Sequence, residues 1–154
     1  MKATNKVYQQ SNAIVTVALN RFSKSEYNAF LKADESISSR QRLAQRLIDY
    51  LCKKFKIASA QVKVVNRAQP HATGLSGRLQ RKTLGTYTVG REVITLYNLT
   101  AMKKQVVSIK TMLGTLLHEF MHHYDMTYLK LGASIHSAGF YKRISDLEKK
   151  LQTA

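Results

Sequence analysis

Leu113 to Asp125 reads L-G-T-L-L-H-E-F-M-H-H-Y-D, an apolar stretch that carries His118, Glu119 and His122 in the spacing H-E-x-x-H. Residues four apart lie on one face of a helix, so the imidazoles of His118 and His122 should lie side by side. Glu119 should lie one step around the same helix. Two imidazoles beside a carboxylate suit a metal ion and a water molecule activated by it. This stretch therefore predicts a helix that presents a metal site.

The third metal ligand must come from another part of the chain, because a catalytic zinc ion usually has three protein ligands and one open position. A His six residues after His122 is excluded, since that position holds Tyr128. His136 follows His122 by 14 residues, past Gly132, where the chain is expected to turn back. We therefore take His136 as the best candidate for the third ligand of a zinc ion.

Other side chains remain as alternatives. His123 is rotated by about 100° from His122, so it should face away from the metal and lie on the surface or pack against other residues. Asp125 lies on the metal face one turn further along, where we expect it to accept a hydrogen bond from an imidazole N–H. His71 stands alone in a basic loop and is interpreted as a surface residue. The acidic residues of the last helix complete the candidates.

The second strong feature is charge, because 25 Lys and Arg residues oppose 9 acidic residues and give a net charge of +16. Residues 1–110 carry 20 basic and 5 acidic groups, whereas residues 111–154 carry 5 and 4. Such an excess favours a polyanionic partner, and nucleic acid is the commonest one in a cytoplasm. Acidic proteins and a membrane surface are the alternatives. The candidate nucleic-acid contacts are Arg67, Arg78, Arg81, Lys82, Lys103 and Lys104.

Length and composition place the chain in a broad class. The 154 residues suit one domain, 1–154, with residues 1–12 flexible and a monomer favoured. No apolar stretch approaches the roughly 20 residues of a membrane span, and Ala13 to Leu19 lacks the cleavage site of a signal peptide. Cys52 has no partner for an internal disulfide, which fits a reducing compartment. We expect a cytoplasmic protein, nucleoid-associated or nuclear.

Hydrophobic spacing and turn residues predict one small α+β domain with N-terminal helices, a three-stranded sheet, the His-rich helix and a closing helix. Ser38 and Gln41 resemble a capping box at the start of the second helix. The expected elements are a helix within Ala13–Leu31, a helix Ser39–Lys56, a strand Gln61–Asn66, a loop 67–82, a hairpin of Thr83–Thr88 and Glu92–Tyr97, the helix Val106–Leu129, and a last helix that Ser137 caps.

Two segments resemble a known family. T-L-L-H-E-F-M-H-H-Y at Thr115 to Tyr124, followed by H-S-A-G-F-Y-K at His136 to Lys142, resembles the SprT-like/Spartan metalloproteases. Members carry H-E-x-x-H, a small residue and Tyr, then a third His in an H-x-x-x-F-x-K/R setting. I-T-L-Y-N at Ile94 to Asn98 is similar to the strand that precedes the family's active helix. The close match covers residues 113–144.

The resemblance implies a zincin-like fold with His118, His122 and His136 as zinc ligands and Glu119 as the catalytic acid and base. Tyr124 matches the family's Tyr. Known members act on proteins attached to or associated with DNA. The chain departs from the pattern at His123, which replaces a small residue, and it carries no cysteine set for the zinc ribbon of many members. Any DNA contact would then fall to the basic loop.

The chemistry expected is metal-assisted amide hydrolysis, in which Glu119 takes a proton from water and delivers it to the leaving amine. The candidates for a hydrogen-bond donor to the oxyanion are Tyr124, Tyr141 and Arg143. The strand Ile94–Asn98 is the candidate for binding an extended protein substrate by β-addition. Two alternatives are a basic nucleic-acid-binding module with a structural zinc, and a mobile-element protease directed at a specific host protein.

Overall fold

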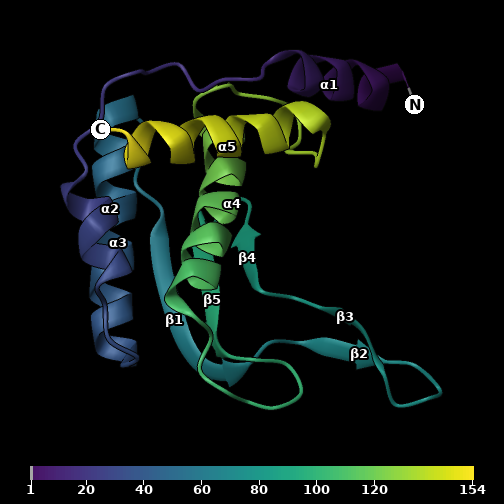
Figure 1. Ribbon diagram of the computed structural model, residues 1–154. Helices are drawn as coiled ribbons and strands as arrows, with labels where there is room; N and C mark the ends of the chain where they lie inside the picture. The colour runs from purple at the N-terminus through teal and green to yellow at the C-terminus, as the bar shows by residue number, and fades with distance from the viewer. Residues whose placement is uncertain (1) are drawn as a thin grey trace.

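The protein is an α+β domain built on a three-stranded sheet (Figure 1). The structure is a computed structural model that describes residues 2–154 and the side chains of residues 5–79 and 81–154. The strand order is β1-β5-β4. The central strand pairs parallel with β1 and antiparallel with β4. The bounds are β1 (Gln61–Ala68), β4 (Gly85–Thr88) and β5 (Val93–Leu99).

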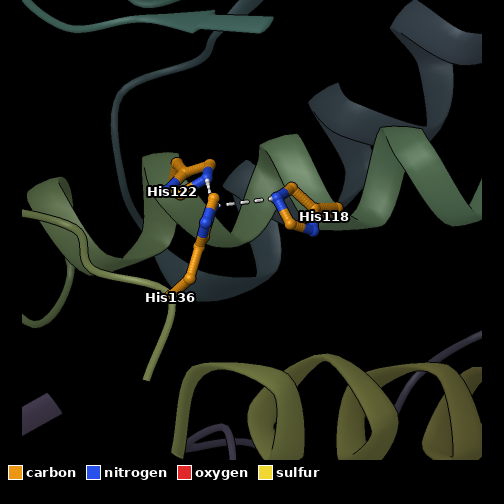
Figure 2. Close-up of side chains that lie close together, drawn as sticks. All are labelled: His118, His122 and His136. Atoms are coloured by element: carbon orange, nitrogen blue, oxygen red, sulfur yellow. Dashed lines mark hydrogen bonds between the residues drawn. The ribbon is translucent and has the colours of Figure 1, made fainter. Parts of the chain in front are cut away.

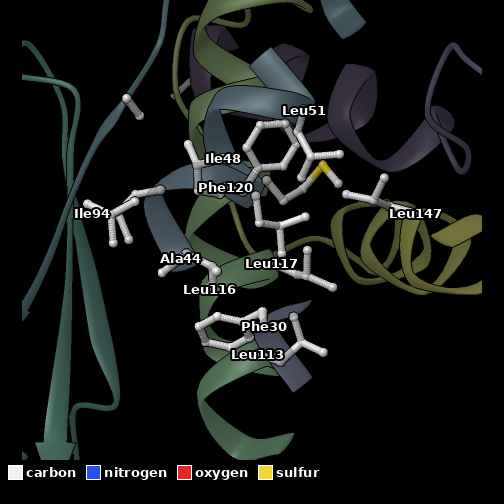
Figure 3. Close-up of a cluster of buried hydrophobic side chains, with 14 of the residues drawn as sticks. Phe30, Ala44, Ile48, Leu51, Ile94, Leu113, Leu116, Leu117, Phe120 and Leu147 are labelled. Carbon is white, nitrogen blue, oxygen red and sulfur yellow. The ribbon is translucent and has the colours of Figure 1, made fainter. Parts of the chain in front are cut away.

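One face of this sheet is covered by α3 (Ile37–Phe55) and α4 (Ile109–Thr127), as Figures 1 and 3 show. Side chains alternate between the faces of a strand, so Ile94 and Leu96 of β5 point into the core and are buried. The helix α4 contributes residues spaced three and four apart, which lie on its inner face. Those at its centre are Leu113, Leu116, Leu117 and Phe120, all buried.

The last helix, α5 (Ala138–Gln152), begins where Ser137 Oγ accepts a hydrogen bond from the Phe140 N–H at 3.0 Å. It packs against α4 and against the first helix, α1 (Lys2–Ala13). A Cβ at Gly139 would collide with the backbone of Ser11 and Asn12, so only glycine permits this close approach. The first and last helices therefore pack against each other beside the His-rich helix (Figure 1).

A second, two-stranded sheet projects from the body (Figure 1) and pairs β2 (His71–Thr73) antiparallel with β3 (Leu79–Lys82). We call residues 69–82 the arm. It leaves the sheet after β1 and returns directly into β4, which is the strand at the edge of the main sheet.

The predicted three-stranded sheet, the β4–β5 hairpin, the helix ending near Lys56, the His-rich helix and the last helix are confirmed. Ser36, not Ser38, caps α3, accepting a hydrogen bond from the Ser39 N–H at 3.2 Å. None of the helices in residues 2–154 is both long and apolar enough to cross a membrane.

The helix predicted within Ala13–Leu31 is confirmed as α2 (Ser25–Leu31). Residues 1–12 were expected to be flexible; residues 2–13 form α1, which packs against α5. The loop predicted at 67–82 is wrong in part, because it contains the arm's hairpin of β2 and β3. The packing of α1 against α5 joins distant segments, which local spacing cannot report.

Candidate metal centre

Three imidazoles converge beside α4, where the loop that leads into α5 passes the helix (Figure 2). His118 and His122 lie one turn apart on α4, and His136 comes from the loop immediately before α5. Nε2 of His136 lies 3.2 Å from Nε2 of His118 and 3.0 Å from Nε2 of His122. The ligand atoms of all three residues lie within 4.8 Å of one another.

These separations suit a zinc ion. Zn–N bonds of about 2.0–2.1 Å in a tetrahedral shell separate the ligand nitrogens by about 3.3 Å. Burial, and then the neighbouring imidazoles, lower the pKa of His122 to about 4, and the same causes lower the pKa of His118. Both shifts favour the neutral imidazole, which is the form that binds a metal ion.

Glu119 lies beside this cluster and is 7% exposed. Burial raises the pKa of its carboxyl to about 7. Within residues 5–79 and 81–154 no side chain donates a hydrogen bond to this carboxyl. A carboxyl group that titrates near neutral pH and is not held by other protein groups is suited to accepting and releasing protons.

A cavity of about 730 Å³ connects Glu119 and the three imidazoles with the sheet edge. It is bounded by α4 on one side and by β4 on the other. A Cβ at Gly85 would lie 2.7 Å from Thr115 Cγ2, so glycine lets β4 approach the helix here. The residues lining the cavity besides the four already described are Lys82, Thr83, Leu84, Gly85, Thr86, Tyr87, Val89, Thr111, Gly114, Thr115 and Ser134.

The strand predicted to add a substrate, Ile94–Asn98, cannot do so. It lies within β5, which is the central strand and has a partner on each side, so its backbone groups are already paired. The edge of the sheet beside the cavity is β4 instead. The prediction fails because hydrophobic patterning identifies a strand without giving its place in the sheet.

His123 points away from the three imidazoles and fastens β4 to the rest of the protein. Its Nε2 lies 2.6 Å from the Ala58 carbonyl oxygen, and its Nδ1 lies 2.8 Å from the Tyr87 hydroxyl. A carbonyl only accepts hydrogen bonds, so Nε2 carries the proton and Nδ1 accepts from the Tyr87 hydroxyl. Since His123 is fully buried, this departure from the family pattern serves packing and strand placement.

Asp125 reaches His122 through a third residue rather than directly. Ser134 Oγ donates to Asp125 Oδ2 at 2.8 Å and lies 2.7 Å from His122 Nδ1. On its other side, the Asp125 carboxylate accepts from Arg143 Nη2 at 2.9 and 3.0 Å. Sequence reasoning missed Ser134, and the signal that could have found it is a hydroxyl residue two positions before the third His.

The three side chains expected to donate a hydrogen bond to the oxyanion lie at different distances from the imidazoles. The Tyr124 hydroxyl accepts a hydrogen bond from the Ala18 N–H, and its ring stacks on Tyr128, so it is not a neighbour of the metal ligands. Arg143 is fully buried against Asp125. The half-exposed Tyr141 ring lies 6.0 Å from the His118 ring and 5.9 Å from the His136 ring. Of the three, Tyr141 is the one beside the imidazoles.

The six predicted nucleic-acid contacts gather at the arm and its base. The Gln69 N–H donates to the Leu99 carbonyl at 2.9 Å, which joins the start of the arm to the end of β5, where the next loop begins. In the part of the chain that the structure describes, no acidic group forms an ion pair with any of the six. They are Arg67, Arg78, Arg81 and Lys82 on the arm side and Lys103 and Lys104 in that loop, all exposed. His71 is exposed on β2, outside the imidazole cluster.

Comparison with protein-family models, curated proteins and solved structures finds no match to this chain.

Proposed function

We propose that this protein is a zinc-dependent metallopeptidase with a zincin-like, SprT-like active site. The observation that carries the proposal is a cluster of three imidazoles beside a buried carboxyl group. Nε2 of His136 lies within 3.2 Å of Nε2 of both His118 and His122. The Glu119 carboxyl beside them is buried and accepts no hydrogen bond from the described side chains. A purely structural zinc site would have no need of such a carboxyl group or of a cavity that leads to it.

The three imidazoles would hold one zinc ion, which supplies a Lewis acid that polarises the scissile carbonyl and lowers the pKa of a water molecule towards about 7. Glu119 accepts a proton from that water as the new C–O bond forms. It then gives the proton to the amine nitrogen as the C–N bond breaks, so the carboxylate is regenerated.

The substrate would lie as an extended peptide along the open edge of β4, whose backbone groups face the cavity side of the sheet. Pairing of this kind reads the peptide backbone, so sequence specificity should be loose. Leu84, Tyr87 and Val89 line the cavity and favour an apolar side chain next to the cleaved bond.

Proteins associated with or crosslinked to DNA are the proposed substrates. Lys82 ends β3 on the arm and also lines the cavity, so the cationic arm leads directly to the cleft. DNA bound to the arm would thus hold the proteins attached to that DNA near Glu119. The resemblance to the SprT-like family supports the same substrate class.

Metal analysis and a cleavage assay test the proposal. Purified protein should contain about one zinc ion per chain, and it should cleave a basic DNA-binding protein such as a histone in the presence of DNA. Glu119→Gln should retain the metal and lose cleavage by at least about 100-fold, since the general base is removed.

Glu35→Gln, at an exposed position in the turn before α3, is the matched control and should cleave like the wild type. Equal cleavage by Glu119→Gln would overturn the proposed mechanism. A wild type that binds zinc and DNA tightly but cleaves nothing would favour the nucleic-acid-binding module instead.

A further inference from the structure

The nitrogen of His122 that faces away from the cluster enters a chain of hydrogen bonds that runs from the part-buried Ser134 to the buried Asp125. Nδ1 of His122 lies 2.7 Å from Ser134 Oγ, and Ser134 Oγ donates to Asp125 Oδ2 at 2.8 Å. Asp125 is on the same helix as His122, whereas Ser134 is in the loop that carries His136. The hydroxyl therefore links the helix that holds two imidazoles to the loop that holds the third.

The direction of each hydrogen bond in this chain follows from the groups involved. Asp125 is fully buried in an ion pair with Arg143 and acts as an acceptor. A serine hydroxyl has one hydrogen, and that of Ser134 is directed to Asp125. Ser134 Oγ therefore offers only lone pairs to His122, so Nδ1 of His122 must be the donor. The proton of the neutral ring is then on Nδ1, which leaves the lone pair on Nε2.

Arg143, at the far end of this series of hydrogen bonds, is held rigidly. Arg143 Nη1 donates to the carbonyl oxygens of Ser11 and Ile14, each at 2.6 Å, while Nη2 donates to Asp125. Both charged side chains are 0% exposed, so water does not compete for these contacts. The Asp125 carboxylate is thus held by Arg143 on one side and by Ser134 on the other, and Arg143 is in turn held by the segment 11–14.

We propose that Ser134 is a positioning residue that holds His122 as the Nδ1–H tautomer and directs its Nε2 lone pair at the metal position. The role of this tautomer in metal binding rests on the proposed function, whereas the tautomer itself is a property of the metal-free protein. Groups that orient a metal-binding imidazole typically change metal affinity 10–100-fold when they are removed.

The test uses full-length protein labelled with ¹⁵N at histidine. In the metal-free wild type at pH 7, long-range ¹H–¹⁵N spectra should show His122 protonated at Nδ1. In Ser134→Ala the ring should shift towards a mixture of tautomers, and zinc affinity, measured by competition with a chelator, should fall about 10–100-fold.

Ser134→Thr keeps the hydroxyl and should restore both the tautomer and the affinity to within about threefold of the wild type. Ser145→Ala, at an exposed position on α5, is the matched control and should change neither. Protonation of wild-type His122 at Nε2, or an unchanged tautomer in Ser134→Ala, would overturn the proposal. If the wild type takes up no zinc while His122 is held as Nδ1–H through Ser134, the proposed function fails and the positioning role stands.

Discussion

The Tyr87 hydroxyl on the edge strand β4 lies 2.8 Å from Nδ1 of His123 on α4, and His123 in turn binds the Ala58 carbonyl. One buried imidazole thus fixes the distance between the two walls of the cavity. The width of the proposed substrate cleft is set by a residue that faces away from the cleft.

Tyr87→Phe removes the partner of a buried ring nitrogen. Leaving a buried acceptor unsatisfied costs about 1–3 kcal/mol, so the free energy of unfolding should fall by that amount. Urea denaturation followed by circular dichroism measures it. Tyr8→Phe, on the exposed side of α1, should leave stability unchanged. A Tyr87→Phe protein as stable as the wild type would contradict the assigned hydrogen bond.

Zinc should stabilise the folded protein, because the three imidazoles are brought together only on folding. Free zinc at 100 times its dissociation constant should add about 2.7 kcal/mol, and a chelator should remove that gain. His136→Ala should lose most of this stabilisation in thermal unfolding. The control is His71→Ala, outside the cluster, which should respond to zinc as the wild type does. A full zinc response in His136→Ala would reject it as the third ligand.

Asp125→Asn should be among the most destabilising single changes. It leaves the fully buried Arg143 guanidinium without its counter-charge, which typically costs about 3–5 kcal/mol. The pair of Arg46 and Glu26, in which the Arg46 side chain is half-exposed, provides the comparison, and Arg46→Met should cost less than about 1 kcal/mol. Chemical denaturation of both variants measures how much free energy of unfolding each has lost. Equal losses would refute the prediction.

Alkaline pH should destabilise the fold. Burial raises the pKa of Cys52 from 9.0 to about 11, and those of Tyr87 and Tyr124 from 10.0 to about 12. Each group holds its proton more tightly in the folded state, so its contribution to stability is complete below about pH 9. That contribution is lost as the pH rises towards 12.

Urea midpoints measured between pH 8 and pH 11 should therefore fall with pH. Tyr124→Phe removes one titrating group and should make the decline shallower than in the wild type. In Tyr8→Phe, which removes a tyrosine at the surface, the slope should be that of the wild type. Parallel declines in all three proteins would rule out a contribution from Tyr124.

Neutralising the arm should weaken nucleic-acid binding. Each lysine or arginine contact with a duplex phosphate contributes about 0.9 to the slope of log affinity against log salt. The triple variant Arg78→Gln, Arg81→Gln, Lys82→Gln should reduce that slope by up to about 2.7 in fluorescence anisotropy titrations. A variant with the same charge change outside the arm, Lys53→Gln, Lys54→Gln, Lys149→Gln, should keep the slope. Equal effects of the two variants would show that net charge alone governs binding.

The sequence predicted the site better than the topology around it. The spacing of His118, Glu119 and His122 is a local property of a helix, so these side chains lie where the pattern put them. The parallel pairing of β1 with β5 depends instead on contacts between segments some 30 residues apart, which strand patterning does not encode. For this reason β5 was taken for an open strand.

Local sequence patterns also could not predict the hydrogen-bond partners within the site. Asp125 was expected to bind an imidazole, and it does so through Ser134, which lies outside the helix. Arg143 was considered for the reaction because of its charge. Its burial against Asp125 and the Ser11 carbonyl depends on the packing of α1, a helix that local composition did not predict.

The tie between Arg143 and the carbonyls of Ser11 and Ile14 also sets an order of events during synthesis. Arg143 follows Ser11 by 132 positions, so the Ser11 carbonyl has no partner until α5 has been translated. The link that orients Asp125, and through it Ser134 and His122, therefore forms only after α5 leaves the ribosome. A nascent chain that has not reached this point would have the H-E-x-x-H helix without the contacts that orient His122.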